Sequence, residues 1–485
     1  MNRPARRGGI AIPSVAAGLL LALSLPPWGW WPLGLVGAGL LYWRLAGLPL
    51  RTRLWSGWLA GLGCFALGLM WARAFNWYGA VVLILLEALF VAAASALTPP
   101  VTGRAPAFVA AATLCEYLRM SWPFGGIPLG GVFLGQADGP LLQLARIGGP
   151  LLLTAGVWAG GVGLATLFSS RRVRGAALLV GLAVLIAIGA LSPDGGVPRR
   201  HISVAIVQGG GRRGVDKEEV APATVFNAQL AASYTLPGGR GPDLVLWPED
   251  VVALGQPLTG SPEDQVLSEL AQSHHTTLIA GVTEPAPHDM FRNEIVAWGP
   301  SGRIVSIFEK VHRVPFGEYV PYRSFFAHFA NLSEVGQDAV PGHANGLMRT
   351  PAGSFGTLVS FEVFYAARSR TSVRAGAQLL IVPTNTSSYT TAQVPTQEVA
   401  ADSIQAVETG RDLIQAAPTG YSTVVTNRGS VLQRSVLARR SVLYATVPLR
   451  RGFTPYDHLG DMPYLIVLVL LLVAGWRRQR RLAKA

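Results

Sequence analysis

Apolar windows of membrane-spanning length recur through the first 191 residues of this 485-residue chain, and one more lies near its end. Each window approaches the roughly 17–25 residues that a helix needs to cross a bilayer. They lie at 9–25, 28–46, 55–73, 79–99, 105–121, 149–169, 175–191 and 462–476. Only 14% of the residues are charged, which is too few for an ordinary soluble enzyme. We predict a polytopic α-helical membrane domain of about eight spans.

Two windows and one loop are less regular than the rest. The windows 28–46 and 105–121 are weak enough to be buried helices of a soluble protein, and losing both would keep the same parity of crossings. The segment 122–149 contains too many glycines and prolines for a regular helix. We expect it to form a re-entrant or surface-lying loop. Irregular backbone cannot face lipid, because its polar groups need hydrogen bonds from protein or water.

Basic residues cluster beside alternate apolar windows. These are Arg3, Arg6 and Arg7, then Arg51 and Arg53, Arg104, Arg171, Arg172 and Arg174, and finally Arg477, Arg478, Arg480 and Arg481. Because lysine and arginine favour cytoplasmic loops, both termini are predicted to be cytoplasmic and 193–460 extracytoplasmic. The net charge of +13 therefore indicates membrane topology, and no nucleic-acid partner is expected. The predicted domains are 1–192, 193–460 and 461–485.

The sequence pattern changes between residues 193 and 460, where short runs of β-forming residues alternate with candidate helices. The runs lie at 202–208, 244–247, 277–282, 295–298, 304–308, 356–361 and 379–383, and the helices at 263–274 and 396–409. This alternation favours an α/β layered domain. The two cysteines, Cys64 and Cys115, both lie in apolar stretches, which excludes a disulfide framework or a cysteine metal site.

Three apolar runs in this region each end at a polar residue. The run from Leu244 stops at Pro248 and presents Glu249, the run 304–308 leads to Lys310, and the run from Gly356 leads to Ser360. Singly, each residue is more often a surface charge or a small strand residue. Together, a carboxylate, an ammonium and a hydroxyl at one end of a sheet could act as general base, oxyanion stabiliser and nucleophile.

Four short motifs surround these residues: P-E at 248–249, K-x-H-x-V-P-F-G-E at 310–318, S-F-E at 360–362 and P-T-N at 383–385. They resemble the Glu, Lys and Cys motifs of the nitrilase superfamily, which implies an αββα sandwich. With its N-terminal spans and one final span, the chain resembles the membrane-embedded apolipoprotein N-acyltransferase family. The glycine-rich segment 125–141 also resembles the membrane-side loop of that family.

The resemblance implies a two-step acyl transfer in the bacterial cytoplasmic membrane. A nucleophile takes an acyl group from a phospholipid, and the acyl-enzyme then acylates the diacylglyceryl-cysteine amine of an apolipoprotein. By position, Glu249 would be the general base, Lys310 the oxyanion stabiliser and Ser360 the nucleophile. The supporting residues would be the acids Glu318 and Glu362, the backbone N–H of Phe361 as a second oxyanion donor, and Asn385. No metal or soluble cofactor is implied, and we expect a monomer.

Ser360 stands where the resembled family has cysteine. A serine hydroxyl is far less acidic than a thiol and needs a well-placed base. Three interpretations stay open at this point: a working serine nucleophile, a natural paralogue that binds lipid or lipoprotein without catalysis, or a deliberate Cys→Ser exchange. The alternative activity is that of a membrane-tethered amidase or esterase, which releases the acyl group to water.

Overall fold

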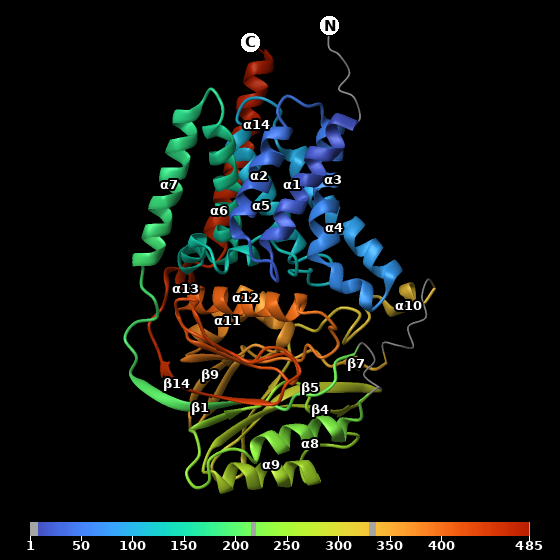
Figure 1. Cartoon of the computed structure of the whole chain (residues 1–485), viewed down its shortest axis with the longest axis vertical. Helices are drawn as coiled ribbons and strands as arrows, with labels where there is room; N and C mark the ends of the chain where they lie inside the picture. Colours follow the sequence, from blue (N-terminus) through green and yellow to red (C-terminus); the bar gives the residue numbers. More distant parts are fainter. Residues whose placement is uncertain (1–7, 215–219, 329–335, 485) are drawn as a thin grey trace. The chain divides into compact units, whose positions relative to one another are not determined.

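The computed structural model describes residues 8–214, 220–328 and 336–484, so the predicted cytoplasmic arginines 3, 6 and 7 lie outside the described residues. It divides into two units (Figure 1). The helical unit comprises the chain up to Ser192 together with the chain from His458 onward, and the α/β unit comprises Pro193–Asp457. The second boundary therefore follows Asp457 instead of residue 460.

Every apolar window coincides with a helix in the helical unit. The helices are α1 (Gly8–Ser24), α2 (Trp31–Arg44), α3 (Leu50–Gly68), α4 (Trp77–Leu97), α5 (Arg104–Arg119), α6 (Ala145–Leu167), α7 (Arg172–Leu191) and α14 (Met462–Lys484). Among the described residues, four stretches are long and apolar enough to cross a membrane: Trp77–Leu97, Pro140–Leu167, Arg172–Leu191 and Met462–Arg481. These four helices indicate a membrane protein, and the count of eight spans stays a prediction.

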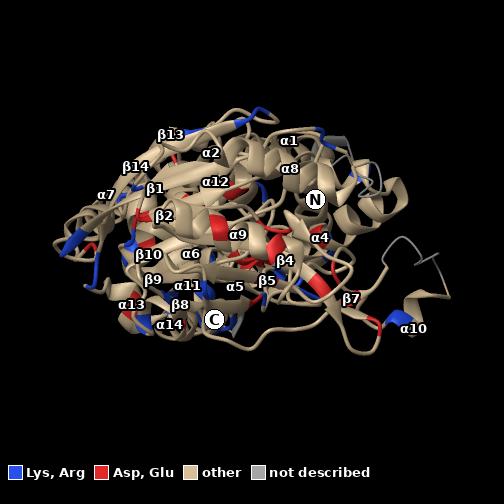
Figure 2. Ribbon diagram, turned by 90° about the horizontal axis from the view of Figure 1, so that it is seen from below, with Lys and Arg blue, Asp and Glu red and all other residues tan. Residues whose placement is uncertain are grey.

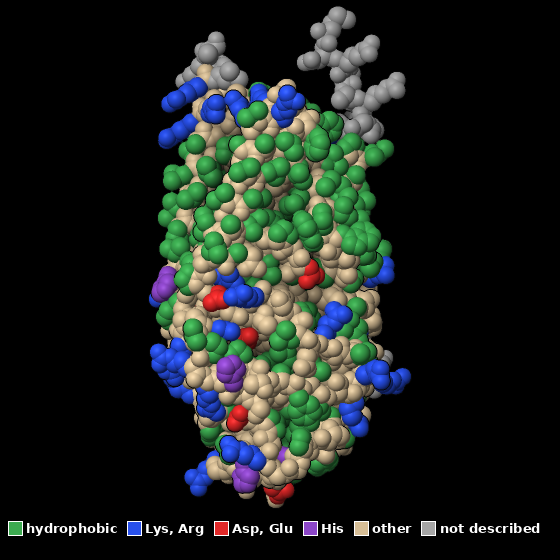
Figure 3. All heavy atoms as spheres, turned by 60° about the vertical axis from the view of Figure 1, so that its left-hand side comes forward, with side chains coloured by type: hydrophobic (Ala, Val, Ile, Leu, Met, Phe, Trp, Pro, Cys, Tyr) green, Lys and Arg blue, Asp and Glu red, His purple; other side chains and the backbone are tan. Residues whose placement is uncertain are grey.

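Exposed apolar side chains cover the helical unit on the face that Figure 3 shows. The exposed large apolar residues of this unit include Val180 and Ile188 on α7 and Val467 and Leu470 on α14. Such a surface is costly in water and suits lipid. Helices inside the unit approach closely through small residues, since a Cβ on Gly18 of α1 would lie 1.9 Å from the carbonyl oxygen of Ala60 in α3.

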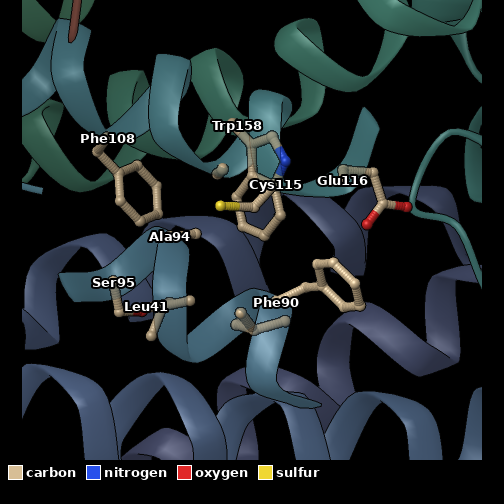
Figure 4. Close-up of a pocket in the computed structure, with 10 residues that line it drawn as sticks. Leu41, Phe90, Ala94, Ser95, Phe108, Cys115, Glu116 and Trp158 are labelled. Atoms are coloured by element: carbon tan, nitrogen blue, oxygen red, sulfur yellow. The ribbon is translucent and has the colours of Figure 1, made fainter. Parts of the chain in front are cut away.

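The chain between α5 and α6 is irregular apart from the 3-10 turns η2 (Leu134–Gln136) and η3 (Pro140–Leu144). The buried guanidinium of Arg119 donates to the carbonyl oxygens of Ile127 and Leu129 in this segment. It also pairs with Glu87 at 2.9 Å and Glu116 at 2.8 Å, so the loop is tied to α4 and α5. A pocket beside this cluster lies among α2, α4, α5 and α6 (Figure 4), and it is lined by Leu41, Phe90, Val91, Ala94, Ser95, Phe108, Ala112, Cys115, Glu116 and Trp158.

The α/β unit contains two sheets. The first has the order β14-β1-β2-β4-β5-β6, with β3 beside β4 and β7 beside β5, and the second has the order β13-β12-β11-β10-β9-β8. The strands of the first are β1 (Arg200–Gln208), β2 (Leu244–Leu246), β3 (Val252–Ala253), β4 (Thr277–Ala286), β5 (Met290–Trp298), β6 (Ile304–Glu309), β7 (Asp338–Ala339) and β14 (Ser441–Leu449). Those of the second are β8 (Leu347–Thr350), β9 (Gly353–Thr357), β10 (Leu379–Pro383), β11 (Leu413–Ala416), β12 (Thr423–Val425) and β13 (Val431–Arg434).

Alternation along the strands builds an αββα sandwich. Ile202, Val204 and Ile206 of β1 face the core between the sheets, whereas Ala205 and Val207 face the helices. Figure 1 shows α8 (Pro222–Ser233) and α9 (Pro262–Ser273) outside the first sheet and α11 (Ala366–Arg374) and α12 (Gln393–Thr409) outside the second. The short helix α10 (Arg323–Phe326) also belongs to this unit, and the boundary after Asp457 falls within the short helix α13 (Pro455–Leu459). Acidic and basic segments are interspersed along the ribbon in Figure 2.

The predicted strand 356–361 is wrong at its end. Strand β9 stops at Thr357, and residues Ser360–Phe364 form the 3-10 turn η5. The strand cannot continue through Ser360, because this residue has a φ of +47°, which an extended strand cannot include.

Candidate active site

The strand directions bring the three predicted residues to comparable positions. Strands β2 and β4 are parallel, and β6 runs the same way because β5 is antiparallel to both β4 and β6. Glu249 therefore follows the carboxyl end of β2 as Lys310 follows that of β6, at one edge of the first sheet. In the second sheet β9 and β10 are parallel, so Ser360 and Thr384 also follow neighbouring strand ends. Carboxyl ends of strands are where α/β sheets place ligands.

Glu249 is held beside strand β4 by a close backbone contact. The N–H of Gly281 donates to the carbonyl oxygen of Pro248 at 2.9 Å. A Cβ on Gly281 would lie 2.4 Å from the Cα of Glu249, so this approach requires glycine. The Glu249 side chain is buried, and its Oε1 accepts from Asn293 Nδ2 at 2.8 Å. Its second oxygen, Oε2, accepts no hydrogen bond from any described residue.

Lys310 bridges two carboxylates in the buried interior. Its Nζ donates to Glu249 Oε1 at 2.9 Å and to Glu318 Oε1 at 2.8 Å. Asn293 Nδ2 donates to the same two oxygens, and the other oxygen of Glu318 accepts from the N–H of Val314 at 2.7 Å. Two of the three ammonium hydrogens of Lys310 are thus used, which leaves one for a substrate oxygen.

The charge balance of this group is uneven, since one ammonium serves two carboxylates. Burial alone lowers the pKa of Lys310, but Glu249 and Glu318 outweigh it and raise that pKa well above its ordinary value of 10.5. The pKa of Glu249 is also raised, first by burial and then by the charge of Glu318, although Lys310 opposes both. Lys310 is therefore a permanent cation, and Glu249 is a stronger base than an ordinary carboxylate.

Ser360 lies in a buried and strained position where η5 begins. Its left-handed φ is uncommon for a residue with a side chain, and such strain concentrates at functional sites. Its hydroxyl accepts from Thr384 Oγ1 at 3.0 Å and donates to Glu398 Oε1 at 3.4 Å. The carboxylate that the described structure places against Ser360 is therefore Glu398, and no hydrogen bond joins this serine to Glu249.

Sequence analysis missed both Glu398 and Thr384. Glu398 lies on α12, whose residues are all buried except Thr396, and Thr384 follows β10. A signal was present, because Glu398 and Asp402 are four residues apart on a predicted helix with no basic residue at helical spacing to pair with either. On a surface helix, such acids normally have a basic residue three or four positions away. The unpaired spacing indicates a buried or functional role.

The supporting residues have unequal roles. The Glu362 carboxylate accepts from the N–H groups of Val311 at 3.0 Å, His312 at 2.9 Å and Val359 at 2.9 Å, so it joins the Lys310 segment to the turn of Ser360. Glu362 thus braces these two segments, and its role as a supporting acid stays a prediction.

The two other predicted supporting residues, Phe361 and Asn385, also differ in their relation to the site. Phe361 lies in the first turn of η5, where a 3-10 helix leaves amide hydrogens without internal acceptors. Asn385 only closes a turn, because its Oδ1 accepts from the N–H of Ser387 at 3.1 Å. The Phe361 amide therefore stays the predicted second oxyanion donor, and the described contacts leave Asn385 outside the reacting group.

We expect Glu362→Gln to lower the free energy of unfolding by about 1–3 kcal/mol, because it weakens three charge-assisted hydrogen bonds. Chemical denaturation monitored by tryptophan fluorescence would measure this. Glu269→Gln is the control, since Glu269 lies on α9 with only a side-chain bond from Gln265. Equal stability of both variants would contradict the bracing role of Glu362.

Comparisons with known proteins agree with this architecture. Residues 203–452 match the carbon-nitrogen hydrolase family model, and residues 17–163 match the model of the apolipoprotein N-acyltransferase N-terminal domain. An apolipoprotein N-acyltransferase of Azotobacter vinelandii is 28% identical over 100% of this chain and 97% of its own length. That of Shewanella oneidensis is 26% identical over 96% and 95%. The crystal structure of Saccharomyces cerevisiae Nit3, of the nitrilase superfamily, is 19% identical over 52% of this chain and 92% of its own, with a TM-score of 0.40.

The family models cover complementary parts of the chain. The carbon-nitrogen hydrolase match spans Glu249, Lys310, Ser360 and Glu398, and the second match spans α2 to α5 and most of α6. Both relatives match from end to end, so the two parts occur together in them as well. The chain belongs to the carbon-nitrogen hydrolase family, joined to an apolipoprotein N-acyltransferase N-terminal domain.

Proposed function

We propose that this chain is an apolipoprotein N-acyltransferase. It moves a fatty acyl group from a phospholipid to the N-terminal amine of a lipoprotein's diacylglyceryl-cysteine, through an acyl-enzyme on Ser360. The observation that carries the proposal is the match to relatives of that name over nearly the whole chain. This chain also combines helices that are long and apolar enough to cross a membrane with a carbon-nitrogen hydrolase domain. A soluble amidase would need only the second part.

The geometry of the site supports a role for each residue. Ser360 Oγ attacks the ester carbonyl of the donor, and the free hydrogen of the Lys310 ammonium stabilises the developing oxyanion. The N–H of Phe361 is the proposed second donor. Glu249 is the general base, while Glu318 and Asn293 hold Lys310 in place through the bonds described above. In the second half-reaction the lipoprotein amine attacks the acyl carbon and Ser360 leaves.

We place the protein in the bacterial cytoplasmic membrane, with both termini in the cytoplasm and the α/β unit outside. The basic tail after α14, where Arg477, Arg478, Arg480 and Arg481 follow an apolar stretch, supports this orientation. So do the arginines at 171, 172 and 174, which precede or begin α7. An extracytoplasmic site would face the compartment in which lipoproteins carry their free amine.

The function can be tested with purified full-length protein, a labelled phospholipid and a diacylated lipopeptide. We expect mass spectrometry to show a triacylated lipopeptide, with the added acyl mass on the N-terminal amine. Free fatty acid without a triacylated product would identify an esterase or amidase instead. Absence of both products would favour the non-catalytic lipid-binding alternative.

A control peptide keeps the assay specific. The same lipopeptide with an acetylated N-terminus has no amine to accept an acyl group, so it should gain no mass. Acylation of this blocked peptide would place the acyl group elsewhere and contradict N-acyl transfer.

A further inference from the structure

The Ser360 hydroxyl contacts a three-residue group that the proposed mechanism does not yet use. Thr384 Oγ1 lies 2.8 Å from Glu398 Oε1 and 3.0 Å from Ser360 Oγ, and Glu398 Oε1 lies 3.4 Å from Ser360 Oγ. Hydroxyl hydrogens rotate, so either Ser360 or Thr384 can be the donor in their shared bond. A proton can therefore pass from Ser360 to Glu398 directly or through Thr384.

Glu398 is built into the interior with one oxygen unused. Its side chain is 2% exposed, and among the described residues its Oε2 has no hydrogen-bond partner. An ionised carboxylate in such a place is unfavourable for stability, because an oxygen without a donor loses its solvation. Buried polar groups left without a partner in a native protein often have a catalytic role. Glu249 also has one oxygen without a partner, but its Oε1 accepts from the Lys310 ammonium and from Asn293, and among the described residues no hydrogen bond joins it to Ser360.

We infer that Glu398 is the catalytic base that activates Ser360, with Thr384 as the bridge between them, and that Glu249 is left to serve the amine acceptor. This inference rests on the proposed function in two respects: it takes Ser360 as the nucleophile, and it takes an amine as the acceptor that Glu249 serves. It answers the chemical need of a serine, whose hydroxyl requires a base placed against it.

The surroundings of Glu398 tune it for this role. Burial and, to a smaller extent, the charge of Glu249 raise its pKa to about 8, against the opposing effects of the Thr384 and Ser360 hydroxyls and the charge of Lys310. Two other titratable groups interact with it: Asp402 one turn along α12, and Tyr389, whose own pKa Glu398 helps to raise. A base with a pKa near the working pH is efficient in proton transfer.

The proton balance closes in both half-reactions. In acylation the Oγ–acyl bond forms, the donor's ester C–O bond breaks, and the Ser360 proton passes through Glu398 to the departing glycerol oxygen. In transfer the N–acyl bond forms, the Oγ–acyl bond breaks, and a proton of the amine passes to Glu249. Glu249 then releases that proton to water, and one proton from water reaches the Ser360 oxygen through Glu398, so that the serine hydroxyl and both carboxylates return to their starting states.

Serine reactivity can be measured without lipid or lipopeptide by using a fluorophosphonate. Ser360 Oγ attacks phosphorus, fluoride leaves, and the serine proton goes to the base, so the labelling rate reports activation of the hydroxyl. With full-length protein in detergent, we expect labelling of Ser360 to rise with pH through about 8. Glu398→Gln, which keeps the shape but cannot accept a proton, should slow labelling at pH 8 by about 100-fold.

Asp402→Asn is the matched control. Asp402 is an equally buried carboxyl on the same helix, and it accepts from Thr423 at 3.1 Å. Among the described residues, no hydrogen bond joins it to Ser360. Its pKa is raised well above the ordinary value by burial and then by the charge of Glu398, which favours the neutral form that asparagine resembles. This variant should label like the wild type. The bridge is tested by Thr384→Val, which should slow labelling, against Thr384→Ser, which should retain it.

The melting temperature is a second measurement, which keeps the inference testable if Glu398→Gln folds poorly. Because the pKa of Glu398 is raised from 4.5 to about 8, the wild type loses stability as pH rises between these values, and the variant does not. The melting temperature of the variant relative to the wild type should therefore increase from pH 4.5 to 8 and stay constant above. A folded Glu398→Gln that labels like the wild type overturns the inference.

The remaining outcomes overturn the inference in separate ways. Equal losses in Glu398→Gln and Asp402→Asn would show a packing effect. If Glu249→Gln loses labelling and Glu398→Gln retains it, then Glu249 is the base that activates Ser360. If the wild type does not label at all, Ser360 is not the nucleophile. If labelling follows the expected pH course but no lipopeptide is acylated, only the proposed function fails.

Discussion

Lys310→Met should lower the free energy of unfolding by about 3–5 kcal/mol at neutral pH and reduce acyl transfer by about 100- to 1,000-fold. The variant leaves Glu249 and Glu318, which now contact the ammonium at 2.9 and 2.8 Å, without their counter-charge in a buried site. It also removes the proposed oxyanion donor. Denaturation curves and the lipopeptide assay would measure the two effects separately.

The pH dependence identifies the cause of this loss. The raised pKa of Lys310 keeps its contribution fully present below 10.5, so the wild type should show no loss from this residue between pH 5 and 9. In Lys310→Met the two carboxylates can relieve their charge only by protonation. Its stability should therefore recover toward the wild-type value as pH falls, and a pH-independent deficit would indicate lost packing instead.

Arg292→Met is the matched control. Arg292 pairs with Glu309 at 3.0 Å, but their side chains are 37% and 23% exposed. Solvent screens such pairs, so the variant should lose less than about 1 kcal/mol. A loss as large as that of Lys310→Met would mean that burial does not decide the value of these ion pairs.

The parts of the site that the sequence predicts are those at strand ends. Glu249 and Lys310 each terminate an apolar run beside a recognisable motif, and parallel strands bring such ends together. The apolar windows are equally visible, since each is a continuous hydrophobic run with a helix in the structure. These features are local in sequence, which is why pattern alone finds them.

Glu398 escapes prediction because its role depends on a tertiary contact. An acid inside a helix is usually a solvated surface residue, and only the packing of α12 against the second sheet makes it a buried neighbour of Ser360. The end of β9 is missed for a related reason. The sequence G-T-L-V-S-F suits a strand, and the left-handed backbone at Ser360 is imposed by the surrounding structure.

Ser360→Ala should abolish acyl-enzyme formation and lower transfer at least about 1,000-fold, because the remaining donors cannot replace a nucleophile. The wild-type adduct is expected to be an oxygen ester that resists neutral hydroxylamine. Intact-protein mass spectrometry after incubation with phospholipid would detect it. Undiminished transfer by Ser360→Ala would remove Ser360 from the mechanism.

Ser360→Cys separates the nucleophile from its base. A thiol has a pKa near 8.5 and ionises with less help, and a thioester acylates an amine more readily than an ester does. We expect a hydroxylamine-sensitive adduct and faster transfer than in the wild type. If Glu398 exists to activate a hydroxyl, Glu398→Gln should cost far less activity in the cysteine background than in the serine background, and this coupling is measured by the double-mutant cycle. Equal costs in both backgrounds would mean that Glu398 supports the site without taking the nucleophile's proton.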